Sequence, residues 1–516
     1  MMNLQTLYLE DINNLYALGK QFLAKEISRN DFKHASGGLG VYSEDCGTRF
    51  MTRLRIPAGL LSLEMLHKIT EWAESYQLDT VHLTTRQSIQ FHGLLLEQVI
   101  ELLKLTSEIG LCTKGAGGNF PRNVASAPLS GIAKDEAFDI MPYSLLVSEY
   151  FKAHMFSYRL PRKLKVCFSN TLADPVHAKI QDIGFVAVCS NGENYFKLYL
   201  GGGLGRNPRL SLLYPELIKA SEVLYYVEAM IQLFIAEGDY QNKGRARIRY
   251  IVERLGEAAF IECFKTHLTH VYDTCTLESA QPTAPITKTG TVSDFSHPRL
   301  CAQKQEGLYS VYVHPHGGQL PVHHMKELLS RLETFEAVSL RLAMEESFYI
   351  INLTLEEAQE ILQLTDAFSG NTQVSYSVAC IGKPICQLGI LNTQSVLNNI
   401  HTALQENGYT QDILPEIHMS GCPNSCGTHQ IAPIGFSGKK KKINDTLCNV
   451  YECTIKGEVS ETQAILGTSV GDIKEEKIPA FICWLYEELN KTQSNFRKWI
   501  ATHESDFTTH LDTMNA

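Results

Sequence analysis

FMTRLRIPAG, residues 50–59, is the stretch from which the fold of this chain is best predicted. Apolar and polar residues alternate along it until Pro-Ala-Gly interrupts the pattern, which predicts a strand that ends in a tight turn. SLEMLHKITEWAESYQ (62–77) has apolar residues at helical spacing, TVHLTTRQSIQFHGL (80–94) resembles a strand, and LEQVIELLKLTSEIG (96–110) resembles a helix. The unit is therefore β-α-β-α.

The same order returns near residue 307. GLYSVYVHPHGGQL (307–320) predicts a strand and turn, VHHMKELLSRLETF (322–335) a helix, AVSLRLAMEESFYIINL (337–353) a strand and LEEAQEILQLTDAFSG (355–370) a helix. PAG in the first copy aligns with HGG in the second, and Leu83 aligns with Leu340. The second copy has no counterpart of TTRQ (84–87). We expect two copies that pair into one unit and share a fold but not a function, since the period is too long for a solenoid.

The rest of the chain is also mixed, which predicts an α/β (α+β) fold. DIGFVAV (182–188) and NYFKLYLGGGLG (194–205) resemble strands, and the polar stretch SAQPTAPITKTG (279–290) resembles a linker. At about 100–200 residues per domain, the length predicts about three domains. The expected segments are a helical arm with the first copy (1–140), a middle region (141–290), the second copy (291–370) and a cysteine-rich region (371–516).

Composition excludes several classes of protein. The formal net charge of −10 over 516 residues argues against a dedicated nucleic-acid binder, which carries a basic face. The first 22 residues lack the pattern of a secretory signal, and no run approaches the ~20 apolar residues of a membrane span. We expect a cytoplasmic protein without a membrane or nucleic-acid partner. Its 14 cysteines then form no disulfide framework, and Cys167, Cys189 and Cys263 resemble buried apolar residues.

Four other cysteines have a different setting. Cys380 and Cys386 lie in ACIGKPIC, and Cys422 and Cys426 lie in SGCPNSCG. Glycine, proline and asparagine around them allow tight turns, so that four thiolates can converge on a 4Fe–4S cluster. Structural zinc prefers closer pairs than the first spacing, and a set of buried, unliganded cysteines would not need so many turn residues. The cluster is the favoured interpretation.

Basic residues inside apolar stretches form a second signal. Arg86 lies in LTTRQSIQFHG, Arg122 in NFPRNVASAP, and Lys163 and Lys165 in LPRKLKVCF. Lysines two residues apart on a strand face the same side. Each residue alone could be a surface cation, but together they predict a pocket for a small anion or a polycarboxylate cofactor.

Other motifs remain ambiguous. GGGLG (201–205) lacks the further glycine of a dinucleotide-binding loop, so we expect a loop against a flat ligand or a simple turn. Lys439 to Lys442 would form a solvated loop or a docking spot for an acidic donor. His323, His324 and His418 are expected at the surface.

The sequence resembles the sirohaem-dependent nitrite and sulfite reductases over nearly its whole length. The matching motifs, in order, are FMTRLRIPAG, TTRQSIQFHG, PRNV, LPRKLK, DIGFVAV, GGGLG, NKGRARIRYIVERLG, ACIGKPIC and SGCPNSCG. The resemblance implies three domains around one cofactor site, with two ferredoxin-like half-domains forming one pseudo-symmetric unit. Segment 141–290 would bind sirohaem and anion, and segment 371–516 would hold the cluster.

The resemblance also implies roles for residues. Cys380, Cys386, Cys422 and Cys426 would bind a 4Fe–4S cluster, and Cys426 would also be the axial ligand of the sirohaem iron. Arg86, Arg122, Lys163 and Lys165 match the family's anion-binding quartet. The residues that would line the sirohaem are Arg55, Gln90, His92, Arg162 and Arg247.

Six-electron reduction of sulfite to sulfide or of nitrite to ammonia follows from this resemblance. Lys165 stands where nitrite reductases tend to have asparagine, and a second cation favours a doubly charged anion, so sulfite is the expected substrate and nitrite the alternative. No flavin or nicotinamide domain is recognisable, so a ferredoxin or a separate flavoprotein would supply electrons. Two other classes are a non-catalytic iron–sulfur electron-transfer or sensor protein and a sirohaem protein that only binds its anion; the basic quartet argues against both.

Overall fold

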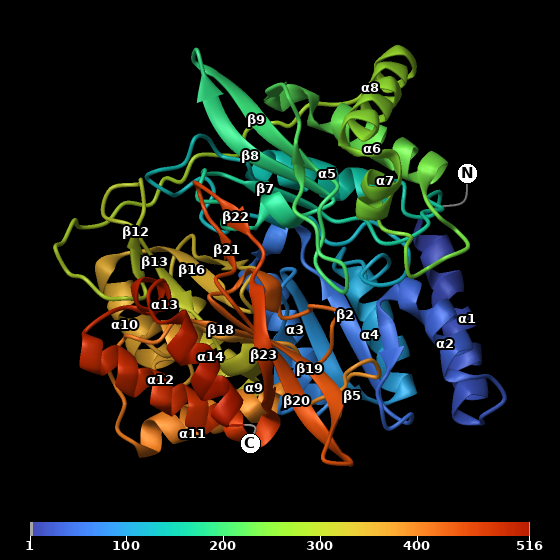
Figure 1. Cartoon of the computed structure of the whole chain (residues 1–516). Coiled ribbons are helices and arrows are strands. Elements are labelled where there is room, and N and C mark those ends of the chain that lie inside the picture. Colours follow the sequence, from blue (N-terminus) through green and yellow to red (C-terminus); the bar gives the residue numbers. More distant parts are fainter. Residues whose placement is uncertain (1–3, 515–516) are drawn as a thin grey trace.

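Each copy of the repeat contains a strand, a tight turn, a helix, a hairpin and a second helix in the computed structural model, which describes residues 4–514 (Figure 1). The first copy comprises β2 (Phe50–Arg55), β3 (Leu60–Leu61), α3 (Leu63–Ser75), β4 (Thr80–Leu83), β5 (Ser88–Leu94) and α4 (Leu96–Glu108). The second comprises β13 (Tyr309–Val313), β14 (Gln319–Pro321), α9 (Val322–Leu332), β15 (Ser339–Leu342), β16 (Phe348–Leu353) and α10 (Leu355–Thr365). The duplicated half-domain predicted from the sequence is confirmed.

Segments 80–94 and 337–353 are hairpins, and the prediction of one strand for each is wrong. Gln87 and Glu346 occupy the same place in the two turns, with φ of 51° and 60°. This left-handed backbone reverses the chain without glycine. The TTRQ turn therefore does have a counterpart, at residues 343–346, and only its side chains differ.

The strand register also corrects the alignment of the copies. Leu83 pairs with Ile89 across the first turn, and Leu342 pairs with Phe348 across the second. Leu83 therefore corresponds to Leu342 and not to Leu340.

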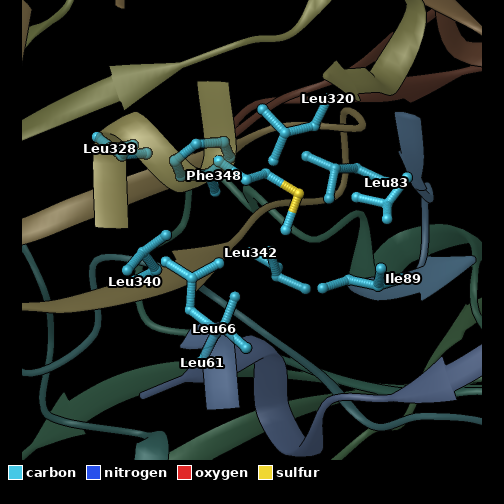
Figure 2. A pocket seen from close by; sticks show the side chains of 11 residues that line it. Leu61, Leu66, Leu83, Ile89, Leu320, Leu328, Leu340, Leu342 and Phe348 are labelled. Atoms are coloured by element: carbon cyan, nitrogen blue, oxygen red, sulfur yellow. The ribbon is translucent and has the colours of Figure 1, made fainter. Parts of the chain in front are cut away.

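The two copies exchange their short strands. β3 pairs with β15, where Leu61 lies opposite Leu340, and β14 pairs with β4, where Leu320 lies opposite Val81. Each five-stranded sheet thus contains one strand of the other copy, and the copies share one apolar core. Figure 2 shows the centre of that core around an apolar void of about 10 Å³. Such a space holds about one water at most, so it is a packing feature and not a ligand site.

A second duplication, which the sequence prediction missed, relates the middle and C-terminal regions. The middle sheet has the order β10-β9-β8-β7-β6, and the C-terminal sheet has the order β17-β18-β19-β20-β23. In each sheet the first three strands in chain order are parallel to one another. Each of the next two strands is antiparallel to the strand before it.

Seven elements of each region correspond in chain order. The middle region has β6 (Ala125–Ser126), α5 (Met141–Ala153), β7 (Val166–Ser169), β8 (Ile183–Ser190), β9 (Glu193–Leu200), β10 (Leu212–Leu213) and α6 (Val223–Glu237). The C-terminal region has β17 (Val378–Ala379), α11 (Thr393–Glu406), β18 (Ile417–Ser420), β19 (Ile434–Ile443), β20 (Thr446–Ile455), β23 (Thr468–Lys474) and α12 (Ile478–Thr492).

The loops after β7 and β18 follow the same path. Left-handed φ values occur at Asp174 and His177 in one (59° and 54°) and at Ser425 and Thr428 in the other (55° and 53°). Both loops return to an Ile-Gly-Phe sequence at the start of the next strand.

In those Ile-Gly-Phe sequences only glycine fits. A Cβ on Gly184 would lie 2.2 Å from the carbonyl oxygen of Ala178, and one on Gly435 would lie 2.0 Å from that of His429. Counted from these glycines, Cys426 has Pro175 as its counterpart. The middle region therefore has the same loop without a cysteine at this position.

The N-terminal helical arm predicted from the sequence is confirmed as α1 (Leu4–Leu23) and α2 (Arg29–Ser36). Cys167 is buried as expected and Cys263 is partly buried, but Cys189 is exposed, and its prediction is wrong. Cys189 pairs with Asn194 near the tip of the β8–β9 hairpin, which leaves the body of the sheet (Figure 1). Between residues 4 and 514, none of the helices has the length and apolar character that crossing a bilayer requires.

Candidate functional site

A cavity of about 1230 Å³ lies where the first half-domain, the middle region and the C-terminal region meet. In Figure 1 these are the blue, green and orange-to-red parts. Segments far apart in sequence form its wall: β2, β5, residues 162–165 and the loops 380–389 and 421–428. Its size exceeds the ~300–1,000 Å³ typical of drug-sized ligands and is suitable for a large cofactor.

All four predicted cluster cysteines line this cavity: Cys380, Cys386, Cys422 and Cys426. The amide of Gly421 donates to Sγ of Cys380 at 3.2 Å, which joins the two cysteine loops. Burial raises the pKa of the first three thiols, and the nearby Cys426 sulfur raises it further. Within residues 4–514 no three His, Cys, Asp or Glu side chains are arranged around one metal ion.

Backbone groups around the cysteines suit bound sulfur. The backbone N–H groups of Asn424 near the Cys422 sulfur, and of Leu388 and Gly389 near the Cys386 sulfur, favour the thiolate and oppose the rise in pKa that burial causes. A Cβ on Gly427 would lie 2.1 Å from the carbonyl oxygen of Met419, so only glycine allows this approach of the loop. The residues present therefore fit a 4Fe–4S cluster.

The turn between β1 (Val41–Ser43) and β2 holds the Cys386 loop in place. The amide of Asp45 donates to the carbonyl of Ile385 at 3.0 Å, and the Asp45 carboxylate accepts from Lys383 at 2.7 Å. The Gln387 side chain also donates to Ser43. The first half-domain thus positions a loop of the C-terminal region.

Arg86 and Arg122 line the cavity with guanidinium groups that the backbone already holds. Arg86 donates to the carbonyls of Asn123 (3.1 Å) and Val166 (2.6 Å), and Arg122 donates to those of Gly115 (3.1 Å) and Gly118 (2.9 Å). Burial lowers the pKa to about 10 for Arg86 and to about 9 for Arg122, so both remain charged at neutral pH. Such preorganised charges do not need to move when an anion arrives.

Lys163 and Lys165 also line the cavity, two residues apart just before β7. Burial lowers the pKa of both lysines. Nearby cations lower the pKa of Lys163 further, chiefly Lys165 and Arg247. The pKa of Lys165 falls to about 7 through burial and through Arg86 and Arg247. Lys165 can therefore both attract an anion and release a proton near neutral pH.

Asp182 anchors this cationic wall, and the sequence prediction missed it. Its carboxylate is fully buried, accepts the backbone amide of Lys165 at 2.8 Å and accepts Arg247 through both oxygens at 2.9 and 2.8 Å. The forked pair orients the guanidinium. The signal available in the sequence was an acid directly before a buried strand, in DIGFVAV.

The residues that the family resemblance assigns to sirohaem lie in two places. Gln90, His92, Arg162 and Arg247 line the cavity. Arg55 does not: its guanidinium donates to the carbonyls of Lys114 and Pro121 behind the wall. Arg53, which the sequence prediction did not select, lines the cavity and pairs in register with Gln90.

Cations predominate on the wall, which fits a cofactor with many carboxylates. Among the described lining residues the carboxylates are Asp11, Glu44 and Glu346, while further cations include Lys114, Arg206, Lys243, Arg245 and Arg249. The end of GGGLG also lines the cavity, and the Gly205 amide donates to Gln430 of the C-terminal region at 2.9 Å.

Two surface predictions need correction. His418 is only 4% exposed because it lies on β18 inside the C-terminal sheet, so its surface assignment is wrong. Lys439 to Lys442 belong to β19 and not to a loop, and Lys439 and Lys441 pair with Asp472 at 2.7 and 2.8 Å. These pairs reduce the charge available to an acidic donor. His323 is exposed and His324 is partly buried.

Two family models match the chain. Residues 43–109 match the nitrite/sulfite reductase ferredoxin-like half domain, and residues 117–272 match the nitrite and sulphite reductase 4Fe-4S domain. The second match covers the middle region, which lacks the four cysteines. These cysteines lie in the C-terminal region, the structural duplicate of the middle region.

Known proteins resemble the chain over most of its length. The chloroplastic ferredoxin–nitrite reductase of Betula pendula is 29% identical over 404 residues, covering 76% of this chain and 68% of that protein. Sulfite reductase (ferredoxin) 1 of Mycolicibacterium paratuberculosis is 27% identical over 404 residues, covering 76% and 70%. The solved structure of the Mycobacterium tuberculosis NirA protein matches with a TM-score of 0.79 at 22% identity, covering 97% of this chain and 94% of that one. The fold, including the ferredoxin-like half-domains, is thus a known one.

Proposed function

We propose, from the premise that this chain belongs to the nitrite and sulfite reductase family, that it reduces sulfite to sulfide with six electrons. The chain is an oxidoreductase of that family, whose cofactors are a 4Fe–4S cluster and sirohaem. When bound, these groups deliver single electrons to an anion at the haem iron. Cys380, Cys386, Cys422 and Cys426 would hold the cluster, with Cys426 next to the haem iron, and the cationic cavity would hold the haem carboxylates.

One observation carries the choice of sulfite: two lysines, Lys163 and Lys165, face a cavity that two charged arginines already line. A fourth cationic side chain adds more to the binding of a dianion than to that of a monoanion, because the Coulomb energy scales with the ligand's charge. An asparagine at position 165 would offer a hydrogen bond without that charge.

The side chains of this wall have separate tasks in the proposed reaction. Arg86 and Arg122, fixed by backbone carbonyls, would orient the anion and balance its charge. Lys165 can release a proton from Nζ near neutral pH, as each departing oxygen of the anion requires. Asp182 would keep Lys165 and Arg247 in position.

Nitrite is the second candidate, and one observation favours it. Several relatives, including those of Betula pendula and Synechococcus elongatus, are named ferredoxin–nitrite reductases. Names of relatives below 30% identity do not determine a substrate that one side chain can alter. The same relatives and the mycobacterial proteins support ferredoxin as the electron donor; a separate flavoprotein is the alternative.

Anaerobic kinetics with reduced methyl viologen test the proposal. Purified holoenzyme should reduce sulfite to sulfide with a higher kcat/KM than nitrite to ammonia. A higher kcat/KM for nitrite would transfer the assignment to nitrite. Absence of a sirohaem absorption band from protein produced with an ample sirohaem supply would instead support the non-catalytic iron–sulfur protein.

A further inference from the structure

Each of the two duplications relates a cation of the anion-facing wall to a carboxylate at the equivalent position of the other copy. Lys165 and Glu416 directly precede the equivalent strands β7 and β18. Arg86 and Glu345 occupy the same position in the two equivalent hairpin turns. Two positions of the cationic wall therefore have acidic pseudo-symmetric counterparts.

His177 lies between this acidic pair and the cavity. Its Nε2 is 3.3 Å from Oε1 of Glu345, and the residue also lines the cavity. The Glu345 side chain is 26% exposed and that of His177 is 17% exposed, so the carboxylate reaches solvent. The φ of 54° at His177 is unusual for a residue other than glycine and must be maintained by its surroundings.

The charged groups around His177 favour proton exchange near neutral pH. Burial lowers the pKa of His177, but hydrogen bonding to Glu345 and the charges of Glu345, Asp174 and Glu416 outweigh it, and the net pKa is raised. Burial and Glu345 raise the pKa of Glu416 to about 7. His418 also faces His177, and burial lowers its pKa to about 3, so it stays neutral.

The other side of His177 connects to the anion-binding wall. Nε2 of Gln181 donates to the His177 carbonyl at 3.2 Å, and Oε1 of Gln181 accepts from Arg86 at 2.9 Å. Nδ1 of His177 is buried and has no hydrogen-bond partner among the described residues. Nε2 of the ring is thus near a solvent-accessible carboxylate, while Nδ1 is enclosed by the protein.

A metal ion is the usual alternative use of neighbouring histidines and glutamates. In the part of the chain that the structure describes, no three such side chains are arranged around one ion. The group is better suited to moving protons than to holding a cation.

We propose that His177 relays protons from the Glu345–Glu416 pair to the cavity while the bound anion is reduced, an inference that rests on the proposed function. One sulfite dianion takes six electrons and seven protons to give hydrosulfide and three waters, with the electrons supplied by the one-electron donor. In the relay, the His177 imidazolium, which the Glu345 carboxylate stabilises, loses its Nε2 proton to a cavity water as that N–H bond breaks, and the ring becomes neutral. Nε2 then regains a proton that solvent delivers through the Glu345 carboxyl group, which restores the imidazolium and the carboxylate.

The variant His177→Asn tests the relay in the holoenzyme, since asparagine tolerates left-handed backbone. With reduced viologen as donor, kcat for sulfite should fall at least about tenfold while KM stays within about twofold. The pH–rate profile should change near neutral pH, and added imidazole should restore much of the rate. His316→Asn is the matched control, because the His316 ring packs against His401 and should leave kcat unchanged.

A second measurement does not depend on turnover. The rate of hydrogen exchange at C2 of His177, followed by mass spectrometry against pH, reports its titration in the holoenzyme. Glu345→Gln should lower the midpoint, because the partner that favours the charged ring is lost.

The outcomes separate the relay from the proposed function. A folded His177→Asn variant with wild-type kcat would overturn the relay, as would a loss that imidazole does not restore. An unchanged C2-exchange midpoint in Glu345→Gln would also overturn it. Wild-type enzyme that reduces nitrite and not sulfite would overturn only the substrate, since nitrite reduction also consumes protons and the same variants apply. Reduction of neither anion would overturn both.

Discussion

The backbone amide of Lys165 donates to Oδ2 of Asp182 at 2.8 Å, and the same carboxylate oxygen holds Arg247 at 2.8 Å. Asp182 is fully buried, so its charge is compensated by these neighbours and not by water. One carboxylate therefore links a proposed anion-binding lysine to an arginine on the cavity wall.

Asp182→Asn should reduce the stability of the protein. Removing one partner of a buried ion pair leaves Arg247 uncompensated, which costs about 3–5 kcal/mol of the free energy of unfolding. Urea denaturation of the cofactor-free protein measures the change. Glu74→Gln is the control, because Glu74 pairs with Lys326 at an exposed site and such pairs contribute about 0–1 kcal/mol. Equal losses in the two variants would contradict a special role for Asp182.

The lowered pKa of Lys165 predicts a pH-dependent stability. Its folded pKa is about 7, through burial, Arg86 and Arg247, while the unfolded chain holds the usual value of about 10.4. Between these values the unfolded state binds the proton that the folded state has released, so stability rises with pH in that window. Below about pH 7 both states are protonated and the full cost of burying the charge is present.

Comparison with Lys165→Met isolates this effect. The free energy of unfolding of wild type minus that of the variant should increase from about pH 7 to about pH 10. Denaturant titrations of cofactor-free protein at several pH values measure it. Parallel curves for the two proteins would contradict the lowered pKa.

Much of the fold could be predicted because local patterns encode it. The half-domain repeat was visible from helical periodicity and from the PAG and HGG turns, which fold alike, with left-handed φ at Ala58 and Gly317. The exchange of β3 and β14 between sheets could not be predicted, since two-residue and three-residue strands carry no periodicity of their own. Such pairing depends on contacts between residues distant in sequence.

The candidate site could be predicted where the type of a residue and its sequence neighbours indicate its chemistry. Four cysteines among turn residues and cations in apolar stretches pointed to positions that all line one cavity. Choosing between Arg53 and Arg55 required the structure, because both have the same strand parity and only backbone carbonyls behind the wall distinguish them. The acidic counterparts Glu345 and Glu416 were equally hidden, since the duplicated regions share fold but few side chains.

Cys426→Ser should prevent assembly of a complete cluster. A serine hydroxyl is a harder ligand than a thiolate and stays protonated near neutral pH, so it binds iron weakly, and the change removes the sulfur proposed to join cluster and haem. Iron content and the broad visible absorption of the purified protein should fall, and sulfite reduction should be abolished. Cys448→Ser on β20, outside the cavity lining, is the control and should retain both. Full activity of Cys426→Ser would exclude the bridging role.

Lys165→Asn addresses the choice between the two anions directly. The change removes one positive charge from the wall but retains a polar side chain, so a dianion should lose more binding energy than a monoanion. A hydrogen bond to a charged group is worth about 1.5–3 kcal/mol, which predicts a loss of about 10- to 150-fold in kcat/KM for sulfite and a smaller loss for nitrite. The measurement is the ratio of the two kcat/KM values in wild type and variant, with Lys491→Asn on the exposed face of α12 as the control. An equal loss for both anions would mean that Lys165 serves anion binding or proton supply in general, and the preference for sulfite would then have to come from Arg86, Arg122 or Lys163.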